Sequence, residues 1–460
     1  MRQLADTVPE PTLLAWNAPL AEALGLSGLA ESDVDLAELF GGNRRPDEAE
    51  PIALAYAGHQ FGNFVPQLGD GRALLIGDVV ATDGRRYDVQ LKGSGRTPFS
   101  RGGDGKSAMG PVLREYVVSE AMHRLGVPTS RALAAVATGE RVMRERLLPG
   151  AVMTRVAASH LRVGTFEYFA ARRDLEALHA LANFAIERHV PDCATSERPY
   201  VALFESTLAA QAKLVASWMG LGFIHGVMNT DNTAISGETI DYGPCAFMDE
   251  FQHDKVFSSI DRGGRYAYRM QPTIAQWNLA RFAECLLLID DAKERYEQAL
   301  EQFIPSYRKA YYNVMCTKLG LRPDDGGQHD ELISAWLQHL QDHQLDFTLS
   351  FRQLADRLDA SSETDEPHFG RFEQRWREAI VTAGDDPAEV RTRMNAVNPL
   401  FIPRNHQIER AIDAATGGDM SIFNDLLEVT TEPYEEQPAL ASYAVPPAPR
   451  ERVTATFCGT

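Results

Sequence analysis

The sequence changes character near residue 160, and this change constrains the fold more than any other feature. From about residue 56 to 158, short apolar segments alternate with tight-turn residues, a pattern that is typical of β-strands. From about residue 166 onward, apolar residues recur with helical periods. The pattern predicts an α+β protein in which a small β-rich lobe precedes a large helical lobe.

The first region is predicted to form a small sheet that carries one helix. Two apolar segments flank the turn residues Thr82-Asp83-Gly84 and predict an antiparallel hairpin. A helical segment begins at Pro111 and ends before Gly126, the usual places for Pro and Gly at helix ends. The expected elements are strands over 73–80 and 85–92, a helix over 111–125, a second hairpin over 131–143 that turns at 138–140, and a strand over 151–157.

The second region is predicted to be helical, with one exception. Residues 223–243 contain too many turn formers for a helix, and their His, Asn and Asp residues are of the kind that carry chemistry on loops. Helices are expected over 175–188, 201–219, 274–290, 292–319, 331–342 and 369–381, and an extended tail from about 436.

The charge balance limits the partners of this chain. Its 460 residues carry 45 Lys and Arg and 64 Asp and Glu, and the net charge of −19 disfavours attraction to nucleic acid or anionic lipid. Any anionic ligand must therefore be held by a local basic cluster. No apolar run approaches the length of a membrane span, residues 1–10 lack the plan of a signal peptide, and the five cysteines lie far apart. We expect a cytoplasmic protein that has neither a nucleic-acid nor a membrane partner.

A loop rich in glycine follows the strand that ends at Lys92. In VQLKGSGRTPFSRGGDGKSAMG (residues 89–110), glycines let backbone N–H groups approach an anion, and Lys92 supplies a positive charge. Glu115 on the next helix could pair with Lys92, as the corresponding residues do in protein kinases. The alternatives are an ordinary flexible loop and, for Glu115 alone, a surface position.

Two further groups of residues could bind an anion. Gly69, Gly71 and Arg72 lie at the entrance to the first strand and could form a turn that covers a nucleotide, or an ordinary hairpin turn. Arg155 and Arg162 bracket the junction between the lobes. In an acidic chain they suggest a phosphate clamp, although structural salt bridges are the alternative.

The segment FIHGVMNTDNTAISGETIDYGPCAF (residues 223–247) holds the strongest chemical signal. Protein kinases use H-R-D-x-x-x-x-N, in which Asp is the base and Asn binds magnesium, and then D-F-G, whose Asp also binds magnesium. Laid over this pattern, His225, Asn232 and Asp241-Tyr242-Gly243 match. The polar cluster comprises His225, Asn229, Asp231, Asn232 and Asp241.

The base position of the kinase pattern is not kept. Val227 stands where the Asp would be, and valine cannot accept a proton. The nearest carboxylate is Asp231, which could serve as the base. Asn232 and Asp241 supply the oxygen ligands that Mg²⁺ prefers beside substrate phosphates.

Four long segments give the chain a family resemblance. YAGHQFGNFVPQLGDGRA, VQLKGSGRTPFSR, VMTRVAASHLRVGTFE and HGVMNTDN…DYGP follow one another in this order. With them the chain resembles the selenoprotein O family of kinase-like protein adenylyltransferases, known in bacteria as the YdiU family. The resemblance extends from about residue 11 to residues 458–460.

The resemblance implies a two-lobed protein kinase fold in which ATP is inverted, with the γ-phosphate buried and the α-phosphate facing the acceptor. The implied reaction is transfer of AMP from ATP to Ser, Thr or Tyr hydroxyls of proteins, with release of pyrophosphate. Family members are also linked with UMP transfer from UTP when Mn²⁺ is present. The resemblance and the change from strand-like to helical patterns near residue 160 together predict four parts of the chain. These are an N-terminal extension over 1–50, an N-lobe over 51–160, a C-lobe over 161–435 and a tail over 436–460 that includes Cys458.

The resemblance also implies a role for individual residues. Asp231 is implied as the base, Asn232 and Asp241 as ligands of Mg²⁺ or Mn²⁺, and Glu115 as the partner of Lys92. The implied nucleotide contacts are Gly69, Gly71, Arg72, Lys92, Asp104, Gly105, Arg155, Arg162 and Asp241.

The chain departs from the family pattern in two places. Cys458 stands where relatives carry selenocysteine or cysteine, and the resemblance implies a redox bond to a cysteine in the loop after Asp-Tyr-Gly. Residues 249–265 contain no cysteine, so such a bond would need Cys245 or Cys285 instead. The stretch before Trp16 is also short for the family.

Two other functions are compatible with the sequence. A phosphotransferase with ordinary ATP orientation would transfer the γ-phosphate, but Val227 disfavours it. A non-catalytic nucleotide-binding scaffold would not need Asp231 beside a metal pair. The sequence leaves open the acceptor proteins, the choice among Ser, Thr and Tyr, AMP against UMP, the metal and the oligomeric state.

Overall fold

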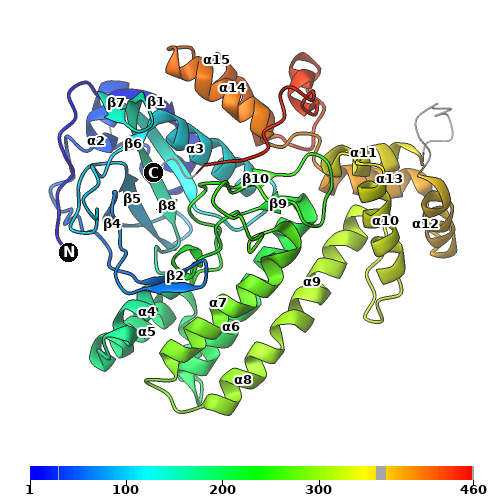
Figure 1. Ribbon diagram of the computed structural model, residues 1–460, viewed down its shortest axis with the longest axis horizontal. Helices are drawn as coiled ribbons and strands as arrows, with labels where there is room; N and C mark the ends of the chain where they lie inside the picture. Colours follow the sequence, from blue (N-terminus) through cyan, green and yellow to red (C-terminus); the bar gives the residue numbers. More distant parts are fainter. Residues whose placement is uncertain (30, 359–368, 458–460) are drawn as a thin grey trace.

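The computed structural model describes residues 1–29, 31–358 and 369–457. The chain forms a smaller lobe built on an antiparallel sheet and a larger lobe built of helices (Figure 1). The predicted α+β, kinase-like two-lobed fold is therefore confirmed. Cys458 lies outside the described residues, and its redox role stays a prediction.

The sheet of the small lobe has six strands in the order β1-β7-β8-β5-β4, with β6 paired to β8, and all its pairings are antiparallel. The hairpin predicted around Thr82-Asp83-Gly84 is confirmed, because β4 and β5 pair along their lengths. The strands of this sheet are β1 (Thr12–Trp16), β4 (Ala73–Val80), β5 (Arg86–Lys92), β6 (Ser107–Ala108), β7 (Arg131–Met143) and β8 (Leu147–Ala157).

The second hairpin, predicted to turn at 138–140, is wrong in position. β7 continues through these residues, and the chain reverses at 144–146 before β8. Residues 138–140 form an irregularity instead, with a register shift between Ala137 and Arg141. Gly139 has φ +73° there and lies against Glu10. The turn-forming residues thus bend a strand that its neighbours hold on both sides, and they do not end it.

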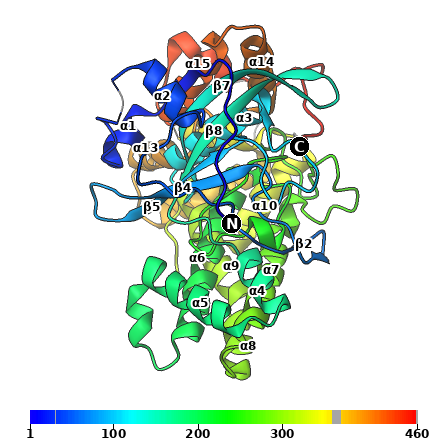
Figure 2. The same cartoon turned by 90° about the vertical axis from the view of Figure 1, so that its left-hand side faces the viewer.

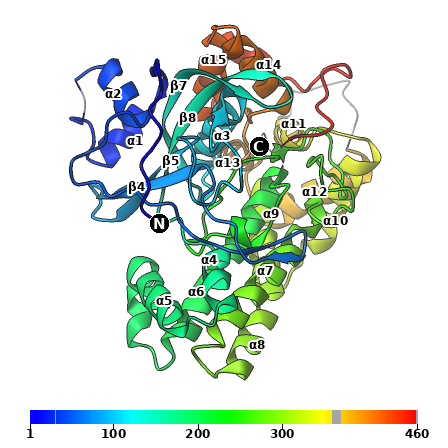
Figure 3. The same ribbon diagram turned by 60° about the vertical axis from the view of Figure 1, so that its left-hand side comes forward.

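Both faces of the sheet are covered by helices. Because strand residues alternate between faces, Ala151 and Met153 of β8 belong to the core around α3, whereas Val152 and Val156 belong to the core around α1 and α2. Figure 3 shows α1 and α2 on one side of the sheet and α3 on the other. These helices are α1 (Ala18–Ala23), α2 (Asp33–Phe40) and α3 (Met109–Arg124).

Two helices from late in the chain also pack on the small lobe. These helices, α14 (Asn405–Thr416) and α15 (Ser421–Thr431), contact α3, and Figure 2 shows them above it. Arg114 of α3 donates a hydrogen bond to Asn405 (3.4 Å) and forms an ion pair with Glu409. The helix that carries Glu115 is therefore held between the sheet and residues 405–431.

The large lobe contains the remaining helices. The helix predicted over 292–319 is divided into α8 and α9, with a break at Gln302 and a proline, Pro305, in the first turn of α9. None of the described helices combines the length and the apolar content needed to cross a bilayer. The helices are α4 (Val163–Ala171), α5 (Leu175–His189), α6 (Pro199–Leu221), α7 (Gln271–Leu286), α8 (Lys293–Glu301), α9 (Phe303–Lys318), α10 (Asp330–Asp342), α11 (Phe347–Asp356), α12 (Gly370–Thr382), α13 (Pro387–Val397), α14 (Asn405–Thr416) and α15 (Ser421–Thr431).

Short elements connect these helices to the site. They are the hairpin strands β2 (Gly58–Gln60) and β3 (Asn63–Val65), the paired strands β9 (Phe223–Ile224) and β10 (Ala246–Phe247), and the 3₁₀ turns η1 (Pro191–Thr195), η2 (Thr230–Asn232), η3 (Tyr268–Met270) and η4 (Pro438–Ala444).

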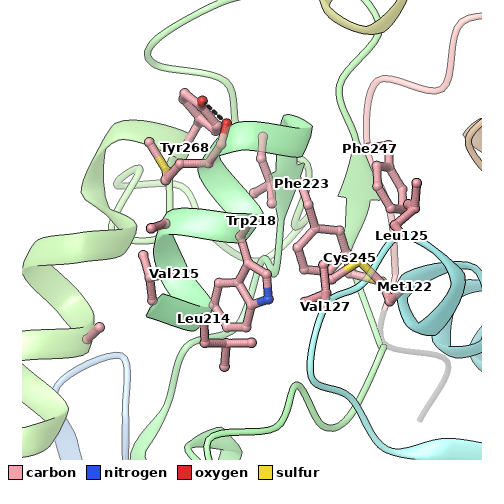
Figure 4. Packing of buried hydrophobic residues seen from close by; sticks show 14 of the residues in the cluster. Met122, Leu125, Val127, Leu214, Val215, Trp218, Phe223, Cys245, Phe247 and Tyr268 are labelled. Atoms are coloured by element: carbon pink, nitrogen blue, oxygen red, sulfur yellow. Dashed lines mark hydrogen bonds between the residues drawn. The ribbon is translucent and has the colours of Figure 1, made fainter. Parts of the chain in front are cut away.

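One apolar core joins the two lobes. Figure 4 shows Trp218 of α6 and Phe223 of β9 beside Cys245 and Phe247, which in turn lie near Met122 of α3 and Leu125 just after this helix. Trp218 donates its ring N–H to Thr239 (2.9 Å), so even the polar edge of this core is satisfied. The loop between β9 and β10 is therefore built on a packed base.

Beyond residue 436, the described chain is partly folded onto the large lobe. It forms η4 and then returns to the loop after Asp-Tyr-Gly. There Thr456 N–H donates to Phe257 O (2.7 Å), and its hydroxyl donates to Pro244 O (2.6 Å). The extended tail predicted from about 436 thus includes a 3₁₀ turn and a docked residue.

Candidate active site

A pocket of about 560 Å³ opens between the two lobes, and residues from both lobes form its wall. Every residue predicted from the sequence to contact nucleotide or metal, or to act as the base, lines it. These residues are Gly69, Gly71, Arg72, Lys92, Asp104, Gly105, Arg155, Arg162, Asp231, Asn232 and Asp241. Glu115 reaches the pocket through its contact with Lys92.

The strand pair β9 and β10 brings together the two ends of residues 223–247, the segment that resembles the catalytic loop of protein kinases. Phe223 pairs with Phe247 and Ile224 with Ala246, so the intervening chain must form a closed loop. His225 is buried below this loop, where its Nε2 lies 2.9 Å from Ile240 O. This frame places Asp231 and Asp241 in the same pocket although they are ten positions apart.

Asp241 lies at the centre of the site, where its carboxylate contacts three cations. Its Oδ1 lies 2.8 Å from Lys92 Nζ and 2.6 Å from Arg155 Nη1, and its Oδ2 lies 2.8 Å from Arg162 Nη1. Burial alone would raise the pKa of Asp241, but Lys92 and the two arginines lower it well below its usual value. Its φ of +62° is in the left-handed region, which Asp tolerates better than most residues. The carboxylate is therefore ionised and is shared by three cations.

The predicted Lys92–Glu115 pair is present in the structure. Lys92 ends β5, and its Nζ lies 2.6 Å from Oε2 of Glu115 on α3. Glu115 Oε1 also accepts from Arg155 Nη1 at 3.3 Å. Gln90, which pairs with Arg155 across β5 and β8, accepts from Nε of Arg155 at 3.2 Å. Lys92 and Arg155 are thus oriented by groups on β5 and α3.

Arg162 connects the cations around Asp241 to the turn that contains Asp231. It precedes α4 and is buried, and its Nη1 donates to the backbone oxygen of Asp231 at 2.9 Å as well as to Asp241. Its guanidinium also lies over the ring of Tyr56, 4.6 Å from the ring centre. One side chain therefore fixes the relative positions of Asp231 and Asp241.

The glycine-rich segments form one wall of the pocket. Gly93 N–H donates to Arg72 O (2.6 Å) and Thr97 Oγ1 to Asp70 O (2.6 Å), so the turn before β4 and the loop after β5 are bonded together. A side chain at Gly69 would overlap Phe99, and one at Gly105, which has φ +68°, would overlap a backbone oxygen. Glycine is required at Gly69 because the turn before β4 lies close to the loop after β5, and at Gly105 because that loop folds back on its own backbone at Gly95.

Sequence reasoning missed two cations at the pocket rim. Arg144 binds Asp104 with its Nη1 at 2.8 Å and its Nη2 at 3.1 Å, and Lys106 N–H donates to the same carboxylate. The hydrogen bonds from Arg144 lower the pKa of Asp104. Arg144 lies in the β7–β8 turn, which was predicted at 138–140. The contact between Arg144 and residues 104–106 could therefore not be predicted. The arginine-rich run at 141–146 in an acidic chain was the available signal.

Asp231 occupies η2 at the inner end of the pocket. It is 7% exposed, and burial raises its pKa to about 6 against the opposing effects of Arg162 and Gln60. Its Oδ2 accepts from Gln60 Nε2 at 3.3 Å, whereas its buried Oδ1 has no hydrogen-bond partner. Val227, at the position of the kinase base, also lines the pocket but offers no acceptor.

The residues predicted as metal ligands have suitable chemistry. Asn232 Nδ2 donates to Val227 O at 2.9 Å, which leaves the amide oxygen as its acceptor atom. Together with the Asp241 carboxylate, it supplies two oxygen ligands. Among the described residues no group of three or more His, Cys, Asp or Glu forms a metal site. Mg²⁺ usually takes one or two carboxylates together with phosphates and water.

This chain is similar to known proteins along nearly its whole length. The family model described as "Protein adenylyltransferase SelO" matches residues 2–431. "Protein nucleotidyltransferase YdiU" of Bradyrhizobium diazoefficiens is 54% identical over 466 residues, which cover 98% of this chain and 95% of the relative. The proteins of the same name from Rhizobium meliloti and Rhizobium johnstonii are 53% and 52% identical, over 98% and 100% of this chain and 95% and 94% of the relatives.

Proposed function

This chain belongs to the family of the protein adenylyltransferase SelO, and we propose that it transfers AMP from ATP to a Ser, Thr or Tyr hydroxyl of another protein. As a member of that family it is a nucleotidyltransferase. One observation supports AMP transfer most directly. The site contains a buried carboxylate, Asp231, that is separate from the cluster of three cations around Asp241.

The basic cluster is suited to the polyphosphate of ATP. Lys92, Arg155 and Arg162 carry three positive charges, and among the described residues only Glu115 and Asp241 form ion pairs with them. If ATP is inverted, the β- and γ-phosphates lie among these cations and the α-phosphate faces Asp231. The cations would then stabilise the charge that develops on the leaving pyrophosphate.

The proposed reaction balances as a single displacement. Asp231 takes the proton of the acceptor hydroxyl, and the oxygen forms a bond to the α-phosphorus. The bond between the α-phosphorus and the oxygen bridging to the β-phosphorus breaks, and pyrophosphate leaves with the electron pair. Asn232 and Asp241 would hold Mg²⁺ or Mn²⁺, whose charge neutralises the phosphates.

The test compares ATP labelled on the α-phosphorus with ATP labelled on the γ-phosphorus. The protein is incubated with Mg²⁺ and a bacterial lysate, with Asp231→Asn as the matched variant, because its amide keeps the size of the side chain but cannot act as a base. Label from the α-position alone, lost in the variant, is the expected result. Label from the γ-position would identify a kinase, and binding without transfer would identify a scaffold.

A further inference from the structure

A short hairpin near the N-terminal end of the small lobe lies against the turn that contains Asp231. β2 and β3 pair from Gly58↔Val65 to Gln60↔Asn63, and we call residues 58–65 the β2–β3 hairpin. β2 contacts η2, the turn that contains Asp231. None of the residues implied to contact the nucleotide or the metal belongs to this hairpin, so its role needs a separate explanation.

Three successive residues of the hairpin bind three successive residues of the loop. His59 N–H donates to Thr230 Oγ1 at 2.7 Å, and Gln60 Nε2 donates to Asp231 Oδ2 at 3.3 Å. The N–H of the next residue, Phe61, donates to Asn229 Oδ1 at 3.3 Å. The contacts join positions 168 to 171 residues apart in the chain, so they form only in the folded protein.

The contact between His59 and Thr230 is anchored from behind by a buried carboxylate. Glu167 on α4 lies with its Oε1 2.5 Å from His59 Nδ1, and its Oε2 accepts from the Thr230 hydroxyl at 2.5 Å. Glu167 and Thr230 are both buried. Thr230 therefore accepts from the hairpin and donates to α4, which fixes the residue immediately before Asp231.

Gly58 limits where the Asp231 carboxylate can lie. A Cβ atom built on Gly58 would be 2.5 Å from Asp231 Oδ1, so the hairpin backbone packs directly against this oxygen. Gln60 meets the other oxygen and also lines the pocket. The carboxylate is thus held between a backbone wall on one side and an amide donor on the other.

We propose that the β2–β3 hairpin is the positioning element for Asp231, in which Gln60 orients Oδ2 toward the acceptor hydroxyl and Gly58 holds Oδ1 in place. The proposal rests on the proposed function, because it assigns Asp231 as the base. Gln60 acts through Asp231 and is a positioning residue. Its loss should slow transfer without weakening the binding of ATP, whose phosphates lie among the cations.

The variants Gln60→Ala, Gln60→Glu and Gly58→Ala test this role, with Gln67→Ala as the control. Gln67 is an exposed glutamine just after the hairpin. The measurements are the rate of label transfer from α-labelled ATP into lysate protein and the apparent KM for ATP. Gln60→Ala should lower the maximal rate about tenfold to a hundredfold, as misplacement of a reacting group by about 1 Å does, with KM changed by less than about twofold.

The glutamate variant separates a donor role from packing. Gln60→Glu keeps the length and shape of the side chain but loses the N–H donor, so it should be at least as slow as Gln60→Ala. Gly58→Ala should also be slow, because its methyl group displaces the carboxylate. A wild-type rate in Gln60→Ala, recovery of the rate in Gln60→Glu, or an increase in KM that accounts for the loss would overturn the proposal.

Hydrogen exchange gives a readout that does not depend on activity. In Gln60→Ala and Gly58→Ala, the amides of residues 227–233 should exchange faster than in the wild type and in Gln67→Ala. Unchanged exchange would overturn the positioning role. If the wild-type protein transfers no label at all, the proposed function fails, and the exchange measurement alone then decides whether the hairpin holds the loop.

Discussion

The two ends of the active site are held by different kinds of interaction. At the nucleotide end, Asp241 is surrounded by Lys92, Arg155 and Arg162 at 2.6 to 2.8 Å. At the acceptor end, Asp231 has one side-chain hydrogen bond of 3.3 Å and one oxygen without a partner. The comparison teaches that charged contacts are concentrated where we propose that the phosphates bind. The side chain of the proposed base has a neutral hydrogen-bond partner instead, which leaves it able to accept a proton.

Replacing Asp241, which joins the three cations, should have the largest effect. Asp241→Ala should abolish transfer from α-labelled ATP and lower the free energy of unfolding by about 3 kcal/mol, because three cations lose their shared partner. Asp241→Asn should be equally inactive but less destabilised, since Asn tolerates the left-handed backbone that Asp241 adopts. Urea denaturation and label transfer would be measured for both variants. Full activity in either one would refute the metal assignment.

The Lys92–Glu115 pair tests whether the nucleotide end acts as one unit. Lys92→Met should slow transfer about a hundredfold, since it removes a cation that stabilises the leaving group. Glu115→Gln should cost less, because it weakens the hold on Lys92 and Arg155 but removes neither cation. If the two residues act together, the double variant should be no slower than Lys92→Met alone. Rates that multiply in the double variant would show that the two residues contribute independently.

Metal dependence distinguishes the ligand Asn232 from the base beside it. Asn232→Ala should raise the Mg²⁺ concentration for half-maximal transfer about tenfold to a hundredfold, the effect expected for a disrupted metal shell. The control is Asn313→Ala, which changes an exposed asparagine on α9. Titration of Mg²⁺ at saturating ATP measures the effect. An unchanged Mg²⁺ requirement would remove Asn232 from the ligand set.

The smallest effect is expected at Glu238, which lies between the two lobes. Its carboxylate accepts from Ala158 N–H at 3.0 Å, and burial raises its pKa to about 7. Arg188 lowers this pKa and Asp88 raises it. Between pH 4.5 and 7 the folded state therefore holds a proton that the unfolded state has lost, so the contribution of Glu238 to stability decreases as pH rises through this window.

Glu238→Gln removes this titration. Relative to the wild type, the variant should gain about 1 to 2 kcal/mol of stability between pH 5.5 and pH 8. Urea unfolding at the two pH values gives the difference, and other titrating groups cancel because they are common to both proteins. A constant difference between the proteins at the two pH values would contradict the shifted pKa.

The parts of the site that could be predicted share one property: their signal is local in the sequence. Asn232 and Asp241 belong to one short segment, and Lys92 ends a strand whose hairpin has a clear turn. Their residue types and spacing carry the chemistry, so the motif remains readable without the fold. The same holds for the division into a sheet lobe and a helical lobe, which follows from residue periodicity.

The parts that could not be predicted depend on contacts between distant segments. Gln60 lies in a strand of three residues, too short for a periodic signal, and it meets Asp231 across 171 positions. The position of Arg144 could not be predicted because residues 138–140 resemble a turn, whereas the residues on either side of them, Ala137 and Arg141, pair with β8 and keep the strand going. An amphipathic helix such as α14 predicts a buried face but does not predict that the partner is α3.

The packing of α14 against α3 has a consequence for synthesis of the chain. Arg114 and Asn405 are 291 residues apart, so at about 5 to 20 residues per second the ribosome needs roughly 15 to 60 s to make the second after the first. During that time the helix that carries Glu115 lacks its outer cover. The end of the site around Asp241 is therefore completed late in translation. A growing chain that already contains Asp231 and Asp241 still lacks α14 and α15, the helices that pack against α3 and its Glu115.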